Sequence, residues 1–351
     1  MTGDGGAFPD RYSRQVLFSP IGSSGQERLA RSRAVLVGCG ALGSGILEML
    51  ARAGVGRIRF IDRDFVEDSN LQRQSLYTEE DARLRRPKAV AAHRALAGIN
   101  AALEYEPRVA DFNASNALEI VRDADVLLDG TDNVETRLLL NEAAVKTGTP
   151  WVYGGCVASG GVVMPVVPGR TPCLRCILPP DAEHGDLPTC DTLGIIAPAA
   201  RIVSSMETAL ALRILAGDAG GIRPFMLHFD CWTGDFHRMD LEGARHDACP
   251  VCARGEFPRL AGEGLSRTVV LCGRNMVQVD FPSMGPGARR PDFAALRERL
   301  SPLGEVSINA YMLIFTLPPH QLVLFPDGRC LVKGTASPEE AKSLYARYIG
   351  L

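Results

Sequence analysis

The chain has 351 residues, of which 46% are hydrophobic and 23% are charged, and this ordinary globular composition excludes collagen-like, low-complexity and long disordered classes. A formal net charge of −3 gives no reason to expect nucleic acid as the main partner. We find no apolar run long enough for a membrane span and no secretory pattern in the opening residues, so we expect a cytoplasmic chain without a membrane partner.

Predicted strands alternate with predicted helices through the first part of the chain. The strand patterns cover 34–37, 57–62, 102–109, 125–129 and 151–157. The helical patterns cover 42–53, 79–98, 116–123 and 134–147. Because such alternation builds a mostly parallel sheet with helices on both faces, we expect a Rossmann-like, doubly wound α/β fold.

The pattern then becomes more antiparallel. A strand is predicted at 160–167, a long helix at 197–216, and a hairpin at 225–230 and 235–241. A segment rich in glycine and charge, 256–266, leads to a small α+β unit with strands at 269–281, 311–317 and 321–332 and helices at 292–300 and 337–348. Ser337 is the expected N-cap of the last helix, with Glu340 as its capping-box partner. The predicted domains are therefore 1–262 and 263–351.

Three glycines, Gly38, Gly40 and Gly43, lie between the first predicted strand and its helix. Glycines at this spacing let the backbone approach a phosphate at a helix N-terminus, although they can also serve only for packing. Asp62 ends the next strand, where a carboxylate can bind a ribose hydroxyl. The pattern predicts a nucleotide site, and its most obvious interpretation is an NAD(P)-dependent oxidoreductase.

The residues that follow argue against a dinucleotide. Arg73 lies in a loop beyond the second strand and Lys88 lies further on, and two cations near a nucleotide suit a triphosphate better. Asp132 and Asn133 follow the fourth strand at the edge where ligands bind, so a Mg²⁺ ion is expected there. Turn formation and helix capping are the alternative roles for this pair.

Two Cys-x-x-Cys pairs, Cys173 with Cys176 and Cys249 with Cys252, provide four thiols. Four thiolates suit a closed tetrahedral zinc site. Because the gap between the pairs is far longer than in a compact zinc ribbon, the spacing also permits two separate redox dithiols.

The sequence resembles the ThiF/MoeB family, bacterial relatives of the ubiquitin-activating enzymes. The resemblance rests on G-C-G-A-L-G at 38–43, D-x-D-x-V-E-x-S-N-L-Q-R-Q at 62–74, D-G-T-D-N at 129–133 and R-Y-S-R-Q at 11–15, and it covers approximately residues 8 to 255. It implies ATP-dependent adenylation of the C-terminal Gly-Gly carboxylate of a small ubiquitin-fold sulfur-carrier protein. Pyrophosphate is released, and the carrier is then ready for thiolation.

The resemblance also implies roles for individual residues. Gly40 and its loop would hold phosphate, Asp62 the ribose, and Asp132 the Mg²⁺ ion, while Arg14 would enter the site of a partner subunit in a homodimer. The implied nucleotide-binding residues are Gly38, Gly40, Gly43, Asp62, Asp64, Ser69, Asn70, Leu71, Gln72, Arg73, Lys88, Asp132 and Asn133. The implied catalytic residues are Arg14, Arg73, Lys88, Asp132 and Cys190.

The cysteines divide into two groups under this resemblance. Family members commonly carry the same two pairs around a structural zinc ion, so Cys173, Cys176, Cys249 and Cys252 are the expected ligands. Cys190 lies in a polar, proline-rich loop where some members use a cysteine for thioester or persulfide chemistry. The neighbouring acids would not lower the pKa of this thiol, and an incidental loop thiol is the alternative.

We therefore expect an adenylyltransferase of a ThiS- or MoaD-like carrier, with a cysteine desulfurase or another sulfur donor as a further partner. The alternatives are an NAD(P)-dependent oxidoreductase and a catalytically silent nucleotide-binding adaptor. The joint presence of Arg14, Arg73, Lys88 and Asp132 argues against the adaptor. The sequence leaves open whether the pathway leads to thiamine, molybdopterin, thiolated tRNA or another product. The unit from 263 onward lies outside the resemblance, and partner docking or stabilisation would explain it.

Overall fold

The computed structural model describes residues 10–178, 193–262, 268–271, 275–279, 291–326 and 328–350. The chain divides into two compact units, Met1–Glu263 and Gly264–Leu351. Among the described residues, no helix has both the length and the apolar character that crossing a bilayer requires.

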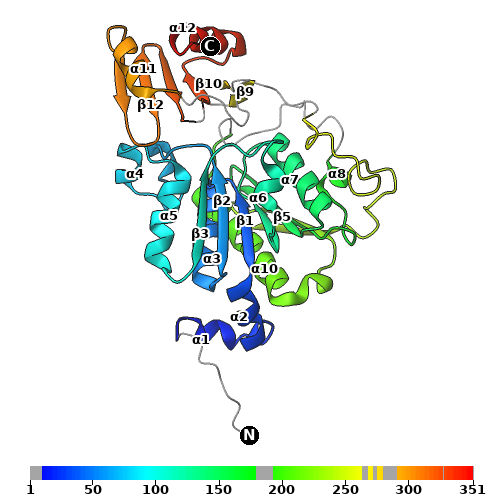
Figure 1. Ribbon diagram of the computed structural model, residues 1–351. Helices are drawn as coiled ribbons and strands as arrows, with labels where there is room; N and C mark the ends of the chain where they lie inside the picture. Colours follow the sequence, from blue (N-terminus) through cyan, green and yellow to red (C-terminus); the bar gives the residue numbers. More distant parts are fainter. Residues whose placement is uncertain are drawn as a thin grey trace. The chain divides into compact units, whose positions relative to one another are not determined.

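The first unit is built on an eight-stranded sheet with the order β3-β2-β1-β4-β5-β6-β7-β8 (Figure 1). Its strands are β1 (Arg33–Val37), β2 (Arg57–Asp62), β3 (Glu104–Val109), β4 (Val126–Asp129), β5 (Trp151–Val157), β6 (Gly160–Val166), β7 (Phe225–Asp230) and β8 (Asp235–Asp240). Strands β1 to β5 pair in parallel, and β5 to β8 pair antiparallel. The predicted doubly wound sheet with an antiparallel extension is confirmed.

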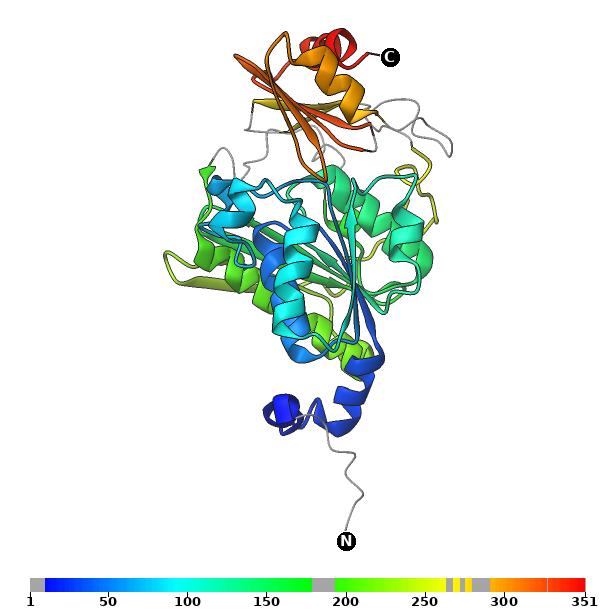
Figure 2. The ribbon, with the colours of Figure 1, turned by 60° about the vertical axis from the view of Figure 1, so that its left-hand side comes forward.

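Helices cover both faces of this sheet (Figures 1 and 2). The helices of the first unit are α1 (Ser13–Val16), which lies beyond the end of the sheet, α2 (Gly22–Arg31), α3 (Ala41–Ala53), α4 (Glu79–Arg83), α5 (Lys88–Ile99), α6 (Ala117–Val121), α7 (Val134–Thr147), α8 (Leu174–Ile177) and α10 (Ala197–Arg213). One core lies between the sheet and α2, α3, α5 and α10, and the other between the sheet and α6, α7 and α8. Alternate residues of β1 enter the two cores, so this strand is buried on both sides.

The helix expected over 79–98 is two helices, α4 and α5. Pro87 lacks a backbone N–H and disfavours helical backbone at the residue before it. Arg85 has a left-handed backbone with φ of 46°, and the chain restarts as α5 at Lys88. This break makes Lys88 the first residue of a helix instead of an interior one.

The second unit is a six-stranded antiparallel sheet with the order β11-β12-β13-β14-β10-β9. Its strands are β9 (Thr268–Leu271), β10 (Met276–Val279), β11 (Glu305–Ile308), β12 (Leu313–Leu317), β13 (His320–Leu324) and β14 (Cys330–Lys333). Helices α11 (Phe293–Leu300) and α12 (Pro338–Tyr348) contribute to one core with alternate strand residues. The domain is α+β, as expected.

Three details of the second unit differ from expectation. The single strand expected over 269–281 is two antiparallel strands, β9 and β10. Strand β11 was not predicted because its polar, largely exposed edge position gives a weak apolar pattern. Ser337 caps α12, as predicted, by accepting a hydrogen bond from the Glu340 amide at 3.3 Å. The Glu340 carboxylate does not bond to the Ser337 amide as a capping box would require, because it bonds to the Thr335 hydroxyl. The Ser337 amide donates to Thr335 Oγ1 at 3.0 Å.

Candidate active site

The loop of residues 38–43 at the end of β1, here called the glycine loop, meets the loop at the end of β4. A Cβ atom on Gly38, where φ is +89°, would lie 2.5 Å from the Gly130 carbonyl oxygen, and one on Gly43 would lie 2.0 Å from the Gly38 carbonyl oxygen. These two positions therefore need glycine for backbone packing. A Cβ on Gly40 would meet only the Gly130 carbonyl oxygen, at an ordinary contact distance of 3.9 Å, so packing does not require glycine at this position.

Asp62, at the end of β2, is 9% exposed and lies beside the glycine loop. Its Oδ2 accepts a hydrogen bond from the Cys39 amide at 2.6 Å, and its Oδ1 accepts one from the Asp64 amide at 2.7 Å. Burial raises the pKa of Asp62, and the Lys88 ammonium opposes this rise. The carboxylate thus ties the loop after β1 to the segment that follows β2.

Lys88 is 3% exposed and contacts the segment after β2 twice. Its Nζ lies 3.0 Å from Asp64 Oδ2, and its amide donates to the Asp64 carbonyl oxygen at 2.8 Å. The structure therefore places the predicted lysine beside Asp62 and Asp64, with its charge already compensated by a carboxylate.

The loop that contains Ser69, Leu71 and Gln72 begins with a short helical turn, Asp68–Asn70. Asn70 is 1% exposed, and its Oδ1 accepts a hydrogen bond from the Glu67 amide at 3.1 Å. Arg73 Nη1 donates to the Ser69 carbonyl oxygen at 2.7 Å. One side-chain atom of Asn70 is thus used to shape the loop itself.

The loop after β4 carries the expected magnesium ligand. Asp132 is exposed. Asn133 Oδ1 accepts a hydrogen bond from the Thr136 amide at 2.8 Å and so caps α7, which is the structural role considered for it above. Because β1, β2 and β4 are neighbours in the sheet, the loops after these strands meet at one edge.

Three side chains at this edge were not predicted. Arg63 Nη1 lies 3.0 Å from Asp111 Oδ1, the Tyr77 hydroxyl donates to the Cys39 carbonyl oxygen at 2.6 Å, and Arg137 Nε lies 3.0 Å from Asp129 Oδ2. Each contact joins residues that are separated in the sequence. Sequence pattern marks Arg63 and Asp129 as flanking the motifs, but it does not give their partners.

The predicted Arg14 lies far from these loops. The N-terminal arm, residues 10–16, is anchored at the last turn of α3 by two neighbours of Arg14. Gln15 Nε2 donates to the Ala53 carbonyl oxygen at 2.9 Å, and the Tyr12 ring packs on Gly54. Arg14 itself is exposed. Figure 1 shows α1 at the end of the sheet where β1 begins, opposite the glycine loop.

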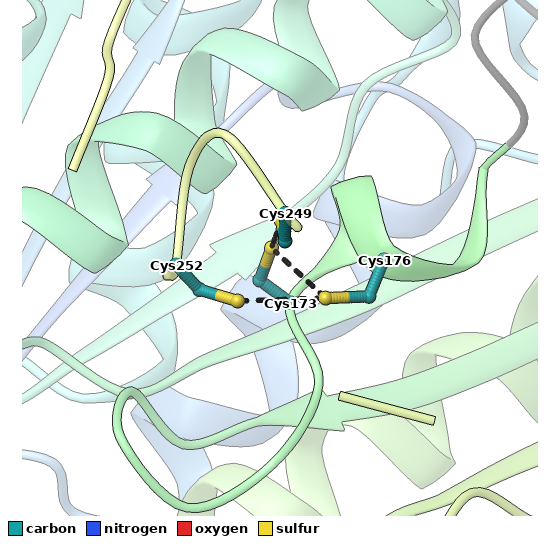
Figure 3. A group of neighbouring side chains, drawn as sticks. All are labelled: Cys173, Cys176, Cys249 and Cys252. Atoms are coloured by element: carbon teal, nitrogen blue, oxygen red, sulfur yellow. Dashed lines mark hydrogen bonds between the residues drawn. The ribbon is translucent and has the colours of Figure 1, made fainter. Parts of the chain in front are cut away.

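The four predicted metal ligands come together in the core between the sheet and helices α6, α7 and α8. Figure 3 shows the four sulfur atoms pointing toward one another, from the segment around α8 and from the segment after β8. The Sγ atoms of Cys173 and Cys176 are 3.9 Å apart, those of Cys173 and Cys249 3.7 Å, and those of Cys176 and Cys252 3.4 Å. Within the described part of the chain, this is the one group of three or more potential ligands with such spacing.

The environment of the cluster shifts the pKa values of its thiols in different directions. Although burial disfavours ionisation of Cys249, hydrogen bonds from the Cys252 amide and from neighbouring thiols lower the pKa of Cys249. Burial and the neighbouring thiols raise the pKa of Cys173, and burial raises the pKa of Cys176 to about 11. Tetrahedral coordination with Zn–S bonds of about 2.3 Å requires sulfur atoms about 3.8 Å apart, which agrees with the observed separations. The donor set and the spacing therefore fit a zinc ion. Cys190 lies outside the described residues.

Comparison with known sequences gives long matches. A sequence model of the ThiF family matches residues 12–251. The chain is 46% identical over 341 residues to the sulfur carrier protein ThiS adenylyltransferase of Bacillus subtilis, covering 97% of this chain and 99% of that protein. It is 38% identical over 248 residues to the sulfur carrier protein adenylyltransferase of Thermus thermophilus, covering 69% of this chain and 90% of that protein.

Solved structures share the fold over a length close to that of the first unit. The crystal structure of E. coli MccB with ATP matches with a TM-score of 0.61 at 24% identity, covering 71% of this chain and 75% of that chain. Selenomethionyl PaaA matches with a TM-score of 0.54 at 21% identity, covering 68% and 78%. At these identities, the likeness establishes the fold alone.

Proposed function

Because the chain belongs to the ThiF family, we propose that it uses ATP to adenylate the C-terminal Gly-Gly carboxylate of a ThiS-like sulfur-carrier protein. The observation that carries this proposal is the 46% identity to a ThiS adenylyltransferase over 97% of the chain. The reaction joins AMP to the carboxylate and releases pyrophosphate. The carrier can then receive sulfur from a donor such as a cysteine desulfurase.

The position of Gly40, immediately before the first residue of α3, supports phosphate binding there. A helix N-terminus has backbone N–H groups without partners inside the helix and a partial positive charge, and the start of α3 would present both to the nucleotide. Packing within the loop requires glycine at Gly38 and Gly43 but not at Gly40, so Gly40 is the glycine that would allow a phosphate to approach the backbone closely. Asp62, at the end of β2, would accept a hydrogen bond from the ribose.

The cations near this loop suit the charge that develops during adenylation. Negative charge builds on the α-phosphate and on the leaving pyrophosphate, and fixed cations stabilise such a transition state. Lys88 and Arg73 would supply them, with Asn70 and the backbone of Ser69, Leu71 and Gln72 completing the loop. Asp64 holds Lys88 at 3.0 Å, which positions the ammonium before ATP arrives.

Asp132 would hold Mg²⁺ beside the phosphates, and Asn133 orders the start of α7 next to it. Exposed carboxylate oxygen is a suitable ligand for this hard cation. When bound, Mg²⁺ would neutralise charge on the phosphate oxygens.

Arg14 would serve the site of a second copy in a homodimer. Arg14 lies between Tyr12 and Gln15, which hold the chain at the C-terminal end of α3, whereas the glycine loop lies at the N-terminal end of that helix. The 13 residues of α3 span roughly 20 Å, which is well beyond the length of an arginine side chain. An exposed arginine at that distance can take part in adenylation only from another subunit.

The cysteine cluster would hold a structural zinc ion. Four sulfur ligands leave no open position for chemistry. The ion would join the segment of Cys173 and Cys176 to the segment of Cys249 and Cys252, which lies 76 residues further along the chain.

Carrier-dependent exchange of labelled pyrophosphate into ATP tests the proposed function. The wild type should catalyse exchange with a ThiS-like protein ending in Gly-Gly and not with a carrier that lacks these two glycines. Asp132→Ala should reduce exchange at least about 100-fold while keeping the fold. Absence of exchange with every Gly-Gly-ending carrier of the organism, or an NAD(P)-dependent absorbance change instead, would contradict the proposal.

A further inference from the structure

Arg137, in the first turn of α7, binds one carboxylate and two backbone carbonyl groups at the carboxyl edge of the sheet. Its Nε donates to Asp129 Oδ2 at 3.0 Å, and its Nη2 donates to the carbonyl oxygens of Thr131 at 2.8 Å and Gly154 at 3.0 Å. The guanidinium also lies over the Tyr153 ring, 5.3 Å from its centroid. The side chain is only 14% exposed, so these contacts are largely shielded from water.

Asp129 completes this arrangement from the end of β4. Its side chain is fully buried, and its Oδ1 accepts hydrogen bonds from the Thr131 amide at 2.8 Å and the Thr131 hydroxyl at 2.6 Å. Arg137 and Asp129 together fix the backbone immediately before Asp132. Within the described part of the chain, the Asp132 carboxylate accepts one long hydrogen bond, from the Asn133 side-chain nitrogen at 3.5 Å.

The same loop presses on the glycine loop. The Gly130 amide donates to the Val37 carbonyl oxygen at 2.7 Å, and a Cβ on Gly130 would lie 2.2 Å from the Gly38 carbonyl oxygen. A shift of the backbone at Gly130 would therefore displace Gly38. The contacts of Arg137 thus constrain both the loop before Asp132 and the loop around Gly40.

We propose that Arg137 is a positioning residue for adenylation, which sets the Asp129–Asp132 loop against the glycine loop. This inference rests on the proposed function of the site. A guanidinium has several donors in a rigid planar arrangement, and it can bind a carboxylate and two carbonyl oxygens at once. A lysine at this position would keep the positive charge beside Asp129 but not the three directed contacts.

Arg137→Lys tests the proposal, with Arg59→Lys as the matched control. Arg59 is 11% exposed and binds Glu106 at 2.7 Å and the carbonyl oxygens of Ile120 at 2.8 Å and Arg122 at 3.1 Å, so it has the same kinds of partner away from the site loops. We expect Arg137→Lys to lower kcat of pyrophosphate exchange about tenfold and to leave KM for the carrier within about twofold. Arg59→Lys should leave both unchanged for folded enzyme.

A second measurement needs no turnover. Mn²⁺ binding in the presence of a non-hydrolysable ATP analogue, followed by electron paramagnetic resonance, should weaken at least about fivefold in Arg137→Lys and not in Arg59→Lys. If Arg137→Lys does not fold, Thr131→Val removes one bond to Asp129 and should weaken Mn²⁺ binding in the same direction by a smaller factor.

Wild-type kcat and Mn²⁺ affinity in the folded Arg137→Lys variant would overturn the positioning role, as would equal losses in Arg59→Lys. If the wild type catalyses no pyrophosphate exchange with any of the carriers tested, that result contradicts the proposed function instead. The Mn²⁺ measurement still decides the positioning role in that case, because it requires no carrier.

Discussion

Glu207, on α10, is a fully buried acid close to the candidate site. Neither of its carboxylate oxygens makes a hydrogen bond of normal geometry, and the carboxyl group packs against Gly154. Burial raises the pKa of Glu207 well above its ordinary value, and the nearby charge of Asp129 adds to this rise. The Arg137 guanidinium opposes this rise, but it is already paired with Asp129.

Glu207→Gln should therefore change how stability depends on pH. An acid whose pKa is higher in the folded state stabilises the fold fully below its unfolded pKa of about 4.3, and this stabilisation is lost as the pH rises toward the folded pKa. The melting temperature of the wild type should fall between pH 5 and pH 8 by several degrees more than that of Glu207→Gln. Thermal melts followed by circular dichroism measure this difference.

Glu27→Gln is a suitable control for that comparison, because Glu27 is exposed and forms only a surface ion pair with Arg31. Parallel pH profiles for the wild type and Glu207→Gln would show that Glu207 has no raised pKa in the folded protein.

At the residue scale, the sequence predicts the positions of its motifs better than it predicts the residues that support them. Gly40 and Asp62 could be found because their spacing from a strand has a known purpose, and the structure brings them together. The contacts of Arg137 with Asp129 and Gly154 could not be found, since they depend on where α7 and β5 lie relative to β4. Nor does an apolar helix pattern reveal that Glu207 faces inward.

At the scale of elements, most of the strands and helices predicted in the first unit are confirmed, although helix α2 was not predicted. Helix α7 and strand β5 have the predicted bounds, because their ends are marked by Asn133, Gly148 and Pro150. The prediction over 79–98 was wrong because the helical composition continues on both sides of Pro87. Composition alone does not show that the chain turns between Arg83 and Lys88, although Pro87 is a physical reason why one helix cannot continue through this segment.

The two segments that carry the cysteine pairs depend on each other through the cluster. Cys249→Ser should remove the bound zinc, about one ion per chain in the wild type, and lower the melting temperature by about 5–10 °C. Metal analysis by mass spectrometry and thermal melts measure the two effects. Cys231→Ser, which changes a cysteine outside the cluster, should leave both unchanged. Full zinc content in purified Cys249→Ser would refute the assignment.

At the scale of the whole molecule, the N-terminal arm separates Arg14 from the site that its own chain forms. Two variants, Arg14→Ala and Asp132→Ala, should each lose at least about 100-fold in pyrophosphate exchange. Mixed and allowed to exchange subunits, they should recover about one quarter of the wild-type activity, because half of the dimers are mixed and each of these has one intact site. Exchange assays on the mixture test this expectation.

The control for that experiment is a mixture of Asp132→Ala with Lys88→Ala. Asp132 and Lys88 would be supplied to each site by the same chain, so no combination of the two variant subunits restores a complete site. Recovery in this control, or no recovery in the Arg14 mixture, would contradict the shared site.

We propose that the second unit, Gly264–Leu351, binds the carrier protein. The match to the Thermus thermophilus relative extends over 248 residues, close to the length of the first unit, whereas the Bacillus subtilis relative matches nearly the whole chain. A chain ending at residue 262 should raise KM for the carrier about tenfold and leave kcat at saturation unchanged. Steady-state exchange kinetics measure both, and an unchanged KM in a dimeric truncated protein would exclude docking.

Gln15 anchors the arm by donating to the Ala53 carbonyl oxygen, and Tyr12 anchors it by accepting a hydrogen bond from the Asn100 side chain. Because Tyr12 and Gln15 hold Arg14 at the far end of its own subunit, a solitary chain would bind ATP and still lack one cation for the reaction. Specific activity should then fall on dilution, and the midpoint of that fall should coincide with dissociation of the two subunits.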